Sequence, residues 1–236
     1  MTTAAVIIIG DEILSGKFAD ENGPWLAGRC RELGIDLVRI SIIPDDVGTI
    51  AAEVQQCVAL ADYIFTTGGV GPTHDDVTMA GIAEAFSVPL VRNADLAALI
   101  QERVGTGVTA EALTMADIPE GTVLWQTEGK RFPVLFCQKV LIFPGVPKYL
   151  RAKFDDIAHR LQGTPIQSRR LKTLQRESEI AACLRNAADR WKAVKIGSYP
   201  RLEEDPTHVI VTLDSRDQDS LNECETWLQG ILSTAD

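Results

Sequence analysis

The sequence is poor in basic residues, histidines and aromatic side chains. Its 236 residues include 23 lysines and arginines against 33 aspartates and glutamates, so the formal net charge is −10 at pH 7. Such an acidic chain is a poor generic binder of nucleic acids and of anionic membranes. We therefore expect neither among its partners, and phosphate groups would have to be bound locally, by backbone amides or through a metal ion.

Features of exported or disulfide-linked proteins are also missing. No uninterrupted apolar run approaches the ~20 residues of a membrane-spanning helix, and the first residues lack the basic and apolar regions of a signal peptide. The five cysteines form no C-x-x-C pair, which favours reduced, mostly buried thiols. We expect a soluble cytoplasmic protein.

Common nucleotide-binding motifs fail on inspection. The G-x-G-x-x-G pattern is incomplete, because Gly69 and Gly71 are followed by His74 at the position of the third glycine. A Walker motif fails because the interval from Gly10 to Gly16 has one residue too many, and Phe18 stands where Ser or Thr is needed. The three histidines make no metal-ligand spacing. Neither a Rossmann dinucleotide site nor a P-loop is supported.

What the sequence does contain is an alternation of buried strands and helical patterns. Continuous β-branched runs are typical of strands in a parallel sheet, and they are expected at 4–10, 35–43 and 62–69. Helices are expected from Asn22 to Gly34, over 47–61, 75–86 and 93–118, and from Pro147, with a strand pair of 123–127 and 134–143 near the sheet edge. This order predicts a three-layer α/β/α fold with a mostly parallel sheet.

The pattern changes around residues 162–167. Strands are expected at 168–174, 193–199 and 207–214, with helices over 177–191 and from about 217. This β-α-β-β-α order predicts a small α+β second domain. We place the two domains at 1–163 and 164–236.

Three acidic loops follow predicted parallel strands, at 10–22, 44–46 and 66–76. Ligands of open α/β sheets bind at the edge where such loops gather. Turn formation alone explains any one loop, but three loops on one edge favour a site.

The third loop combines Gly68, Gly69 and Gly71 with the adjacent Asp75 and Asp76. Glycines can expose consecutive N–H groups as an anion-binding nest, and the helix that follows adds its positive end. A carboxylate repels phosphate unless a divalent cation lies between them, and Mg²⁺ is bound by one or two carboxylates plus phosphate oxygens. The loop therefore predicts a metal–phosphate ligand, with helix capping by Asp76 as the alternative.

Other candidates come from the remaining loops. Glu12 and Asp45 are the best placed of the other acids. Asn22 could bind a ligand or cap its helix, and Lys148 could pair with phosphate or be solvated. Pro144 and Gly145 could form a rigid backbone hook or a plain connector. The full set of ligand-binding candidates is Gly10, Asp11, Asn22, Thr67, Gly68, Gly69, Gly71, Pro144, Gly145 and Lys148.

Four ordered motifs, GDEILSGKFADEN, IPDD, TTGGVGPTHDDVT and FPGVPKYL, resemble those of the molybdopterin-binding fold family. The first motif and the segments ESEIAACLR, VKIGSYP and VIVTLDS are similar to its CinA and FAD-synthase branch. The resemblance implies a ligand at the carboxyl edge of the sheet, as predicted above, and matches functional aspartates of the family to Asp45 and Asp76.

The resemblance further implies a metal-dependent pyrophosphatase acting on an adenosine diphosphate conjugate such as ADP-ribose or FAD. Asp45 and Asp76 would bind Mg²⁺, Mn²⁺ or Co²⁺, and Asp76, Asp45 and Glu12 would be catalytic. The alternatives are a molybdopterin-binding or adenylyltransferase protein, and a non-catalytic ligand-binding module.

The family also sets expectations for the rest of the chain. The second segment resembles the small KH-like domain of CinA proteins, yet residues 165–236 contain no G-x-x-G loop, so RNA binding is unsupported. The amidohydrolase domain of many CinA proteins is not expected here. A dimer or trimer is implied by analogy.

Overall fold

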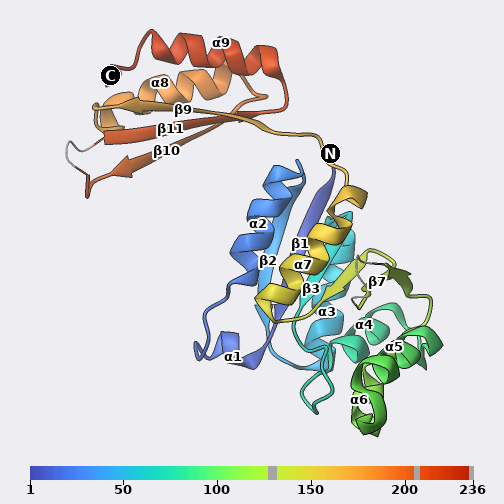
Figure 1. Cartoon of the computed structure of the whole chain (residues 1–236). Helices are drawn as coiled ribbons and strands as arrows, with labels where there is room; N and C mark the ends of the chain where they lie inside the picture. The colour runs from blue at the N-terminus through green and yellow to red at the C-terminus, as the bar shows by residue number, and fades with distance from the viewer. Residues whose placement is uncertain (127–131, 205–207, 234–236) are drawn as a thin grey trace. The chain divides into compact units, whose positions relative to one another are not determined.

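The computed structural model describes residues 1–126, 132–204 and 208–233. The chain divides into two compact units, Met1–Gly163 and Thr164–Asp236 (Figure 1). Thr127 and Thr207, each at one end of a predicted strand, lie outside the described residues.

The first unit is built on a mixed six-stranded sheet with the spatial order β2-β1-β3-β8-β7-β6. The first four strands in this order are parallel to one another. The strand β7 pairs antiparallel with β8 on one side and with β6 on the other. The strands of this unit, including the separate antiparallel pair β4-β5, are β1 Thr3–Ile9, β2 Asp36–Ile43, β3 Tyr63–Thr67, β4 Leu90–Arg92, β5 Asp117–Pro119, β6 Val123–Trp125, β7 Val134–Cys137 and β8 Val140–Phe143.

Helices cover both faces of this sheet, because alternate side chains of a strand point to opposite faces. Ala5, Ile7 and Ile9 of β1 pack with α3 and α4, whereas Ala4, Val6 and Ile8 pack with α2 and α7. The helices are α1 Asp11–Leu14, α2 Asn22–Glu32, α3 Val47–Leu60, α4 Thr78–Phe86, α5 Ala94–Val104, α6 Ala110–Thr114 and α7 Pro147–Ile157, with 3-10 turns η1 Gly105–Gly107 and η2 Ala158–Arg160. The predicted three-layer α/β/α fold is confirmed.

Three local predictions were wrong. The helix expected over 75–86 begins only at Thr78, because Asp76 bonds to Thr73 instead of the helix. The helix expected over 93–118 stops at Val104, since Gly105 has a φ of 71°, and Asp117 pairs with Arg92 across β4-β5.

The run 134–143 is a hairpin, not one strand. Gln138 has a φ of 54° at its turn, and the returning strand β8 pairs with β3 inside the sheet. The first strand of the predicted pair, β6, lies at the edge of the sheet, whereas the run 134–143 lies farther inside it.

An aromatic cluster fixes α7 against the sheet. The ring centroid of Phe154 lies 5.5 Å from that of Phe65 on β3, 5.9 Å from that of Phe143 on β8 and 5.4 Å from that of Trp25 on α2. Phe154, Phe65 and Phe143 are fully buried. Because Phe143 ends β8 and α7 begins at Pro147, this packing holds the short connector 144–146 in place.

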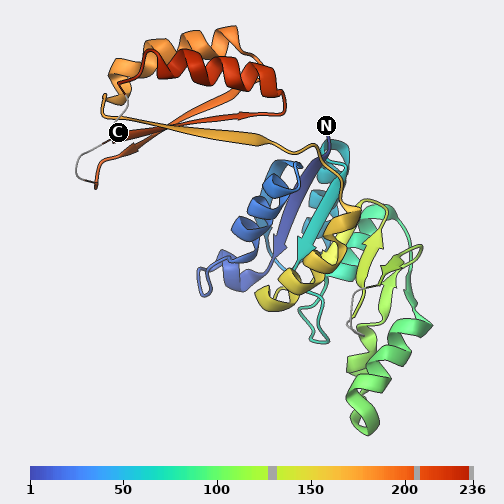
Figure 2. The same cartoon turned by 45° about the horizontal axis from the view of Figure 1, so that its top comes forward.

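The second unit is a three-stranded antiparallel sheet of order β10-β11-β9. Both helices lie on the same side of this sheet in both views (Figure 2), and the core between the two layers includes Leu171, Ile180, Val211 and Leu221. The predicted β-α-β-β-α order is confirmed, with β9 Gln167–Thr173, α8 Glu177–Arg190, β10 Lys195–Arg201, β11 His208–Ser215 and α9 Gln218–Gln229.

The cysteines are free thiols, and all but Cys183 are buried. Burial raises the pKa of Cys30 to about 12, so this thiol is inert at neutral pH. Across the described ranges, no helix combines the length and the apolarity that crossing a bilayer requires.

Two helical glycines should respond oppositely to alanine. A Cβ at Gly81 would lie 2.4 Å from Cγ2 of Ile50, so α3 and α4 approach too closely for a side chain there, whereas a Cβ at exposed Gly28 meets nothing within 4 Å. We expect Gly81→Ala to lower the free energy of unfolding by about 1–3 kcal/mol through overpacking. Gly28→Ala should raise it by up to about 1 kcal/mol, because alanine is the better helix former.

Urea unfolding of both variants and the wild type checks this pair. A stabilised Gly81→Ala protein would contradict the close packing of α3 on α4.

Candidate functional site

Four loops meet at one edge of the sheet because the strands that precede them are parallel neighbours. These loops are 10–22, 44–46, 68–77 and 144–146, after β1, β2, β3 and β8. The prediction that three acidic loops share an edge is thereby confirmed, and the hook at Pro144 joins them. The N–H of Gly10 donates to the carbonyl oxygen of Ile43 over 3.1 Å, which links the first two loops.

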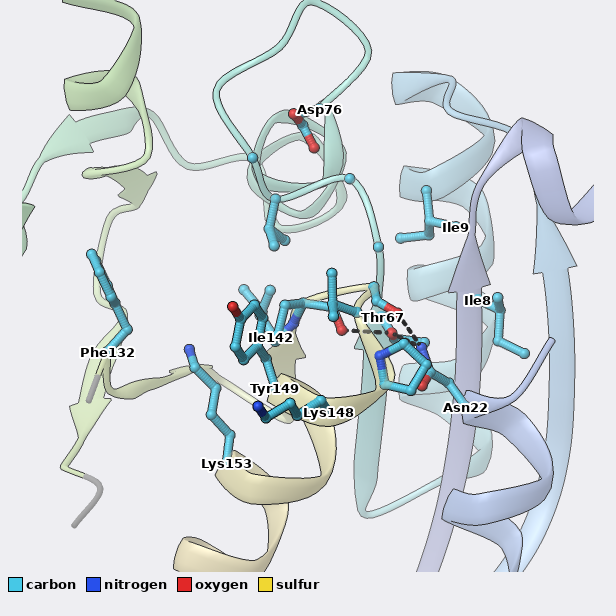
Figure 3. A pocket seen from close by; sticks show the side chains of 18 of the residues that line it. Ile8, Ile9, Asn22, Thr67, Asp76, Phe132, Ile142, Lys148, Tyr149 and Lys153 are labelled. Carbon is cyan, nitrogen blue, oxygen red and sulfur yellow. Dashed lines mark hydrogen bonds between the residues drawn. The ribbon is translucent and has the colours of Figure 1, made fainter. Parts of the chain in front are cut away.

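A cavity of about 1300 Å³ opens at this edge (Figure 3). Most ligand pockets measure roughly 300–1,000 Å³, so this one can hold a ligand with more than one ring system. It is lined by most of the predicted residues, namely Glu12, Asn22, Thr67, Gly68, Gly69, Gly71, Asp76, Pro144, Gly145 and Lys148. Gly10, Asp11 and Asp45 are not among the residues that line it.

The buried amide of Asn22 ties three loops together. Its Nδ2 donates to Oγ1 of Thr67 over 2.9 Å and to the carbonyl oxygen of Gly145 over 2.7 Å, as the dashed lines in Figure 3 show. The hydroxyl of Thr67 donates in turn to the carbonyl oxygen of Pro144 over 3.0 Å. Thr67 therefore positions the loops, and the alternative that Asn22 caps its helix is wrong. The backbone N–H groups of Asn22 and Gly23 are bound by Asp20 instead.

One polar atom of this network has no protein partner. Oδ1 of Asn22 is buried and accepts no hydrogen bond from the described residues. A buried amide oxygen without a donor is unfavourable. Because Asn22 lines the cavity, a ligand N–H or O–H group at this place would satisfy it.

The glycine loop brings three strands into close contact. Gly68 has a φ of 104°, and a Cβ there would lie 2.0 Å from the carbonyl oxygen of Ile9; only glycine fits. Its N–H donates to the carbonyl oxygen of Phe143 over 3.3 Å, so the expected contribution of the Gly68 amide to an anion nest is wrong.

The next three amides are different. In the part of the chain that the structure describes, the N–H groups of Gly69, Val70 and Gly71 donate to no protein acceptor. Thr78 fixes this segment, because its hydroxyl donates to the carbonyl oxygen of Gly68 over 2.8 Å and its N–H to that of Gly69 over 3.0 Å. The adjoining start of α4 has no side-chain cap. Consecutive backbone amides without a protein acceptor can form an anion-binding nest.

The carboxylate of Asp76 sits over this loop. Its Oδ2 accepts from the N–H of Thr73 over 2.8 Å and from the Thr73 hydroxyl over 2.5 Å. A Cβ at Gly71 would lie 2.6 Å from this oxygen, so the missing side chain leaves room for the carboxylate. Asp76 lines the cavity and caps no helix, so the capping alternative is wrong.

Asp45 lies in a cluster of negative charge. Its Oδ2 accepts from the N–H of Asp11 over 2.9 Å. Burial raises the pKa of Asp45 above its usual range, and the carboxylates of Glu12, Asp11 and Asp75 add to the rise while the Asp11 N–H opposes it. A cation among these carboxylates would relieve the repulsion.

The donor set fits a divalent ion that shares its coordination with a ligand. No group of three or more His, Cys, Asp or Glu side chains among the described residues is arranged to hold an ion by itself. In both Asp45 and Asp76, Oδ2 accepts a hydrogen bond from a backbone N–H. The Oδ1 atom of each carboxylate is therefore available to a metal ion. Mg²⁺ binds through one or two carboxylates plus substrate oxygens, and this number of donors agrees with that mode.

A cationic side of the cavity was not predicted from the sequence. It contains Arg103, Lys153 and the ring of Phe132. Nζ of Lys153 donates to the carbonyl oxygen of Pro133 over 2.9 Å. Burial lowers the pKa of Lys153 to about 8, and the charge of Arg103 adds to the effect. The one sequence signal was the i, i+4 spacing of Tyr149 and Lys153, which places both on one face of α7.

These features define an α/β protein with a large cavity at the carboxyl edge of a mostly parallel sheet. Comparison with known families agrees. Residues 5–163 match the family described as probable molybdopterin binding domain, and residues 165–235 match the middle domain of FAD synthase. The chain belongs to the molybdopterin-binding domain family, with an FAD-synthase-type second domain.

Individual relatives agree with this family assignment. The chain is 32% identical to a probable FAD synthase of Caenorhabditis elegans, over 98% of the chain and 50% of that protein, so it spans about half of this relative. It is 31% identical to a protein of Archaeoglobus fulgidus over 97% of both chains. A CinA protein of unknown function from Thermoplasma acidophilum has a similar structure, with a TM-score of 0.63 and 30% identity over 67% of this chain and 97% of that one.

The Asn22 network should be important for stability. Asn22→Ala removes two hydrogen bonds and leaves the carbonyl oxygen of Gly145 without this donor, so we expect the free energy of unfolding to fall by about 1–3 kcal/mol. Asn22→Asp should be at least as harmful, because it places a carboxylate against two oxygens. Exposed Gln101 on α5 supplies the control Gln101→Ala, expected within about 0.5 kcal/mol of the wild type. Urea titration measures all three, and an unchanged Asn22→Ala protein would contradict the network.

Lys153 should lower the stability of the fold. Its pKa of about 8 lies below the unfolded value of 10.5, so the penalty is fully present below pH 8 and disappears as the pH rises from 8 to 10.5. Lys153→Met should therefore raise the free energy of unfolding at pH 7 by about 1–3 kcal/mol. Unfolding measured from pH 7 to 10.5 should show this advantage shrinking; an advantage independent of pH would contradict the assignment.

Proposed function

We propose that the chain is a metal-dependent pyrophosphatase that hydrolyses the diphosphate of an adenosine conjugate such as ADP-ribose or FAD. The observation that carries the proposal is the meeting of a loop of free amides with a carboxylate: the N–H groups of residues 69–71 have no protein acceptor among the described residues, and Gly71 of this loop lies against the carboxylate of Asp76. Amides of this kind bind an anion, and the carboxylate requires a cation between itself and that anion.

The glycine loop would hold the diphosphate. Donors aimed at phosphoryl oxygens stabilise the negative charge that grows as water attacks phosphorus. The loop is fixed by Thr78 and by the close contact of Gly68 with Ile9, so the donors keep their direction. Water adds to one phosphorus, the bond to the bridging oxygen breaks, and the products are two monophosphates: AMP with ribose 5-phosphate, or AMP with FMN.

Asp45 and Asp76 would hold the divalent ion, Mg²⁺, Mn²⁺ or Co²⁺. When bound, such an ion polarises the phosphoryl oxygens and lowers the pKa of water. Burial raises the pKa of Asp45, and the carboxylates of Glu12 and Asp11 add to the rise; this acidic cluster supports a cation at this place.

Glu12 is our candidate for the general base. Its carboxylate lines the cavity and lies against Gly10, where a Cβ would be 2.7 Å from Oε2. The Asp76 carboxylate is engaged by Thr73, whereas no hydrogen bond within the described residues engages the Glu12 carboxylate. Glu12 is thus the more available proton acceptor.

The comparisons support a nucleotide ligand of this kind. The second unit matches the FAD synthase middle domain, and the C. elegans relative carries the name probable FAD synthase. A second candidate, favoured by the family match of residues 5–163, is pterin binding or adenylyl transfer in molybdopterin synthesis at the same edge.

The test compares two aspartates. Asp76→Asn removes a charge that lines the cavity, whereas Asp95→Asn removes an exposed charge that does not line it. With ADP-ribose or FAD and Mg²⁺, Mn²⁺ or Co²⁺, we expect AMP release to fall at least about 100-fold in Asp76→Asn and less than about threefold in Asp95→Asn.

Omission of the metal or addition of EDTA should abolish AMP release from the wild type. Equal activity of the two variants would remove Asp76 from the mechanism. A wild type that releases no AMP but binds a pterin tightly would replace the pyrophosphatase with the second candidate.

A further inference from the structure

One edge of the six-stranded sheet carries apolar side chains that the fold leaves exposed. In the part of the chain that the structure describes, β2 is the last strand on its side of this sheet, so one edge of the strand has no neighbour. Val38, Ile40 and Ile42 of β2 are 49%, 46% and 41% exposed, and we call these three residues the β2 patch. An exposed apolar edge strand is a template for pairing with another strand.

The two edges of the sheet differ in length. At the far edge β6 has three residues, and such a short strand offers little to pair with. β2 has eight residues. Its register with β1 shifts once, between Ala4 and Ala5, and is regular from Arg39 to Ile43. This regular segment contains no proline and no lysine, the residues that commonly protect an edge strand.

The helix layer ends before it reaches β2. Ile40 is in register with Val6, and Ile42 with Ile8. Because neighbours in register point to the same face of a sheet, all four side chains lie on the face that α2 and α7 cover. Val6 and Ile8 are buried in the core under these helices, whereas Ile40 and Ile42 remain about half exposed. The apolar face therefore continues past the helices to the edge of the sheet.

The one charged side chain of the regular segment is engaged with α3. Nε of Arg39 lies 3.1 Å from the carboxylate of Glu53, and its NH1 group donates to the amide oxygen of Gln56 over 3.2 Å. The β2 patch itself is uncharged. This is important because the chain has a formal net charge of −10, so two copies repel each other. An uncharged surface is a place where they can meet.

The backbone of β2 offers hydrogen-bonding groups at this edge. The carbonyl oxygen of Ile43 accepts from the N–H of Gly10, directly after β1. Because the backbone groups of successive residues in a strand point to alternate sides, those of Ile42 and Ile40 point away from β1. An antiparallel copy of β2 can supply a donor and an acceptor to each. With Ile40 opposite Ile42 of the second copy, the two-fold axis passes beside Ser41.

We propose that the β2 patch is an interface between two copies of this chain, which pair their β2 strands antiparallel across a two-fold axis. The axis is perpendicular to the joined sheet, so Ile40 and Ile42 of both copies form one apolar cluster on one face. Such a contact is self-complementary and closes after two copies. Antiparallel pairing places the carboxyl edges of the two sheets at opposite ends, and the inference does not depend on the proposed function.

The molar mass in solution tests this interface. We expect light scattering at tens of micromolar protein to give twice the mass of one chain. Ile40→Lys places two ammonium groups close to the axis and should raise the dissociation constant of the dimer at least about 30-fold. Leu60→Lys is the matched control, because Leu60 is also apolar and 53% exposed but ends α3; this variant should remain a dimer.

Amide hydrogen exchange of the wild type locates the contact without any substitution. The N–H groups of Ile40 and Ile42 should be protected at high protein concentration and exchange faster on dilution, because dilution separates the copies. The N–H of Ile7, on a strand that is paired on both sides, should not respond to dilution.

A dimer that Ile40→Lys dissociates and Leu60→Lys leaves intact would support the interface. A wild type that stays monomeric at tens of micromolar, or a dimer that Ile40→Lys leaves intact, would overturn it. Exchange at Ile40 and Ile42 that is independent of concentration would also overturn it. Since Ile40 is half exposed in one copy, Ile40→Lys should leave the single chain folded, which its urea-unfolding midpoint checks.

Discussion

The site depends on one buried amide group. Asn22 begins α2, Thr67 ends β3 and Gly145 follows β8, and the two hydrogen bonds donated by the Asn22 amide join all three. These hydrogen bonds are important because Thr67 and Asn22 are both withdrawn from water, and unpaired buried polar groups are unfavourable. The glycine loop follows directly after Thr67, so this network holds the start of the loop in place and keeps its free amides in one orientation.

Charge divides the cavity into two regions with different chemistry. Acidic side chains gather at the loops after β1, β2 and β3, where burial and mutual repulsion raise the pKa of Asp45. Cationic side chains gather on α5 and α7, where burial and Arg103 lower the pKa of Lys153. A ligand of opposite charge would relieve the repulsion within each region. The metal-bound diphosphate of the proposed function would do so for the first region.

Prediction from the sequence succeeded where local pattern and burial agree. β1 is buried on both faces, so its continuous apolar run was a direct signal. It failed where a contact distant in sequence decides the local structure. Asp76 belongs to the turn closed by Thr73, which moves the start of α4 to Thr78, and Asp117 pairs with Arg92 in a strand where a helix was expected. The amide of Gly68 was assigned to a ligand, yet its N–H completes the contact with β8.

By itself the sequence determined the order of the main strands and helices, the acidic loops and the glycine-rich turn, because these follow from side-chain periodicity and backbone freedom over a few residues. Only the tertiary structure decided which amides remain free, that Asn22 joins loops instead of capping a helix, and that Lys153 shares a cavity with Phe132 although 20 residues separate Lys153 from Pro133, its hydrogen-bond acceptor. These properties depend on which groups meet and how much water reaches them, and the parallel packing of β1, β3 and β8 brings those groups together.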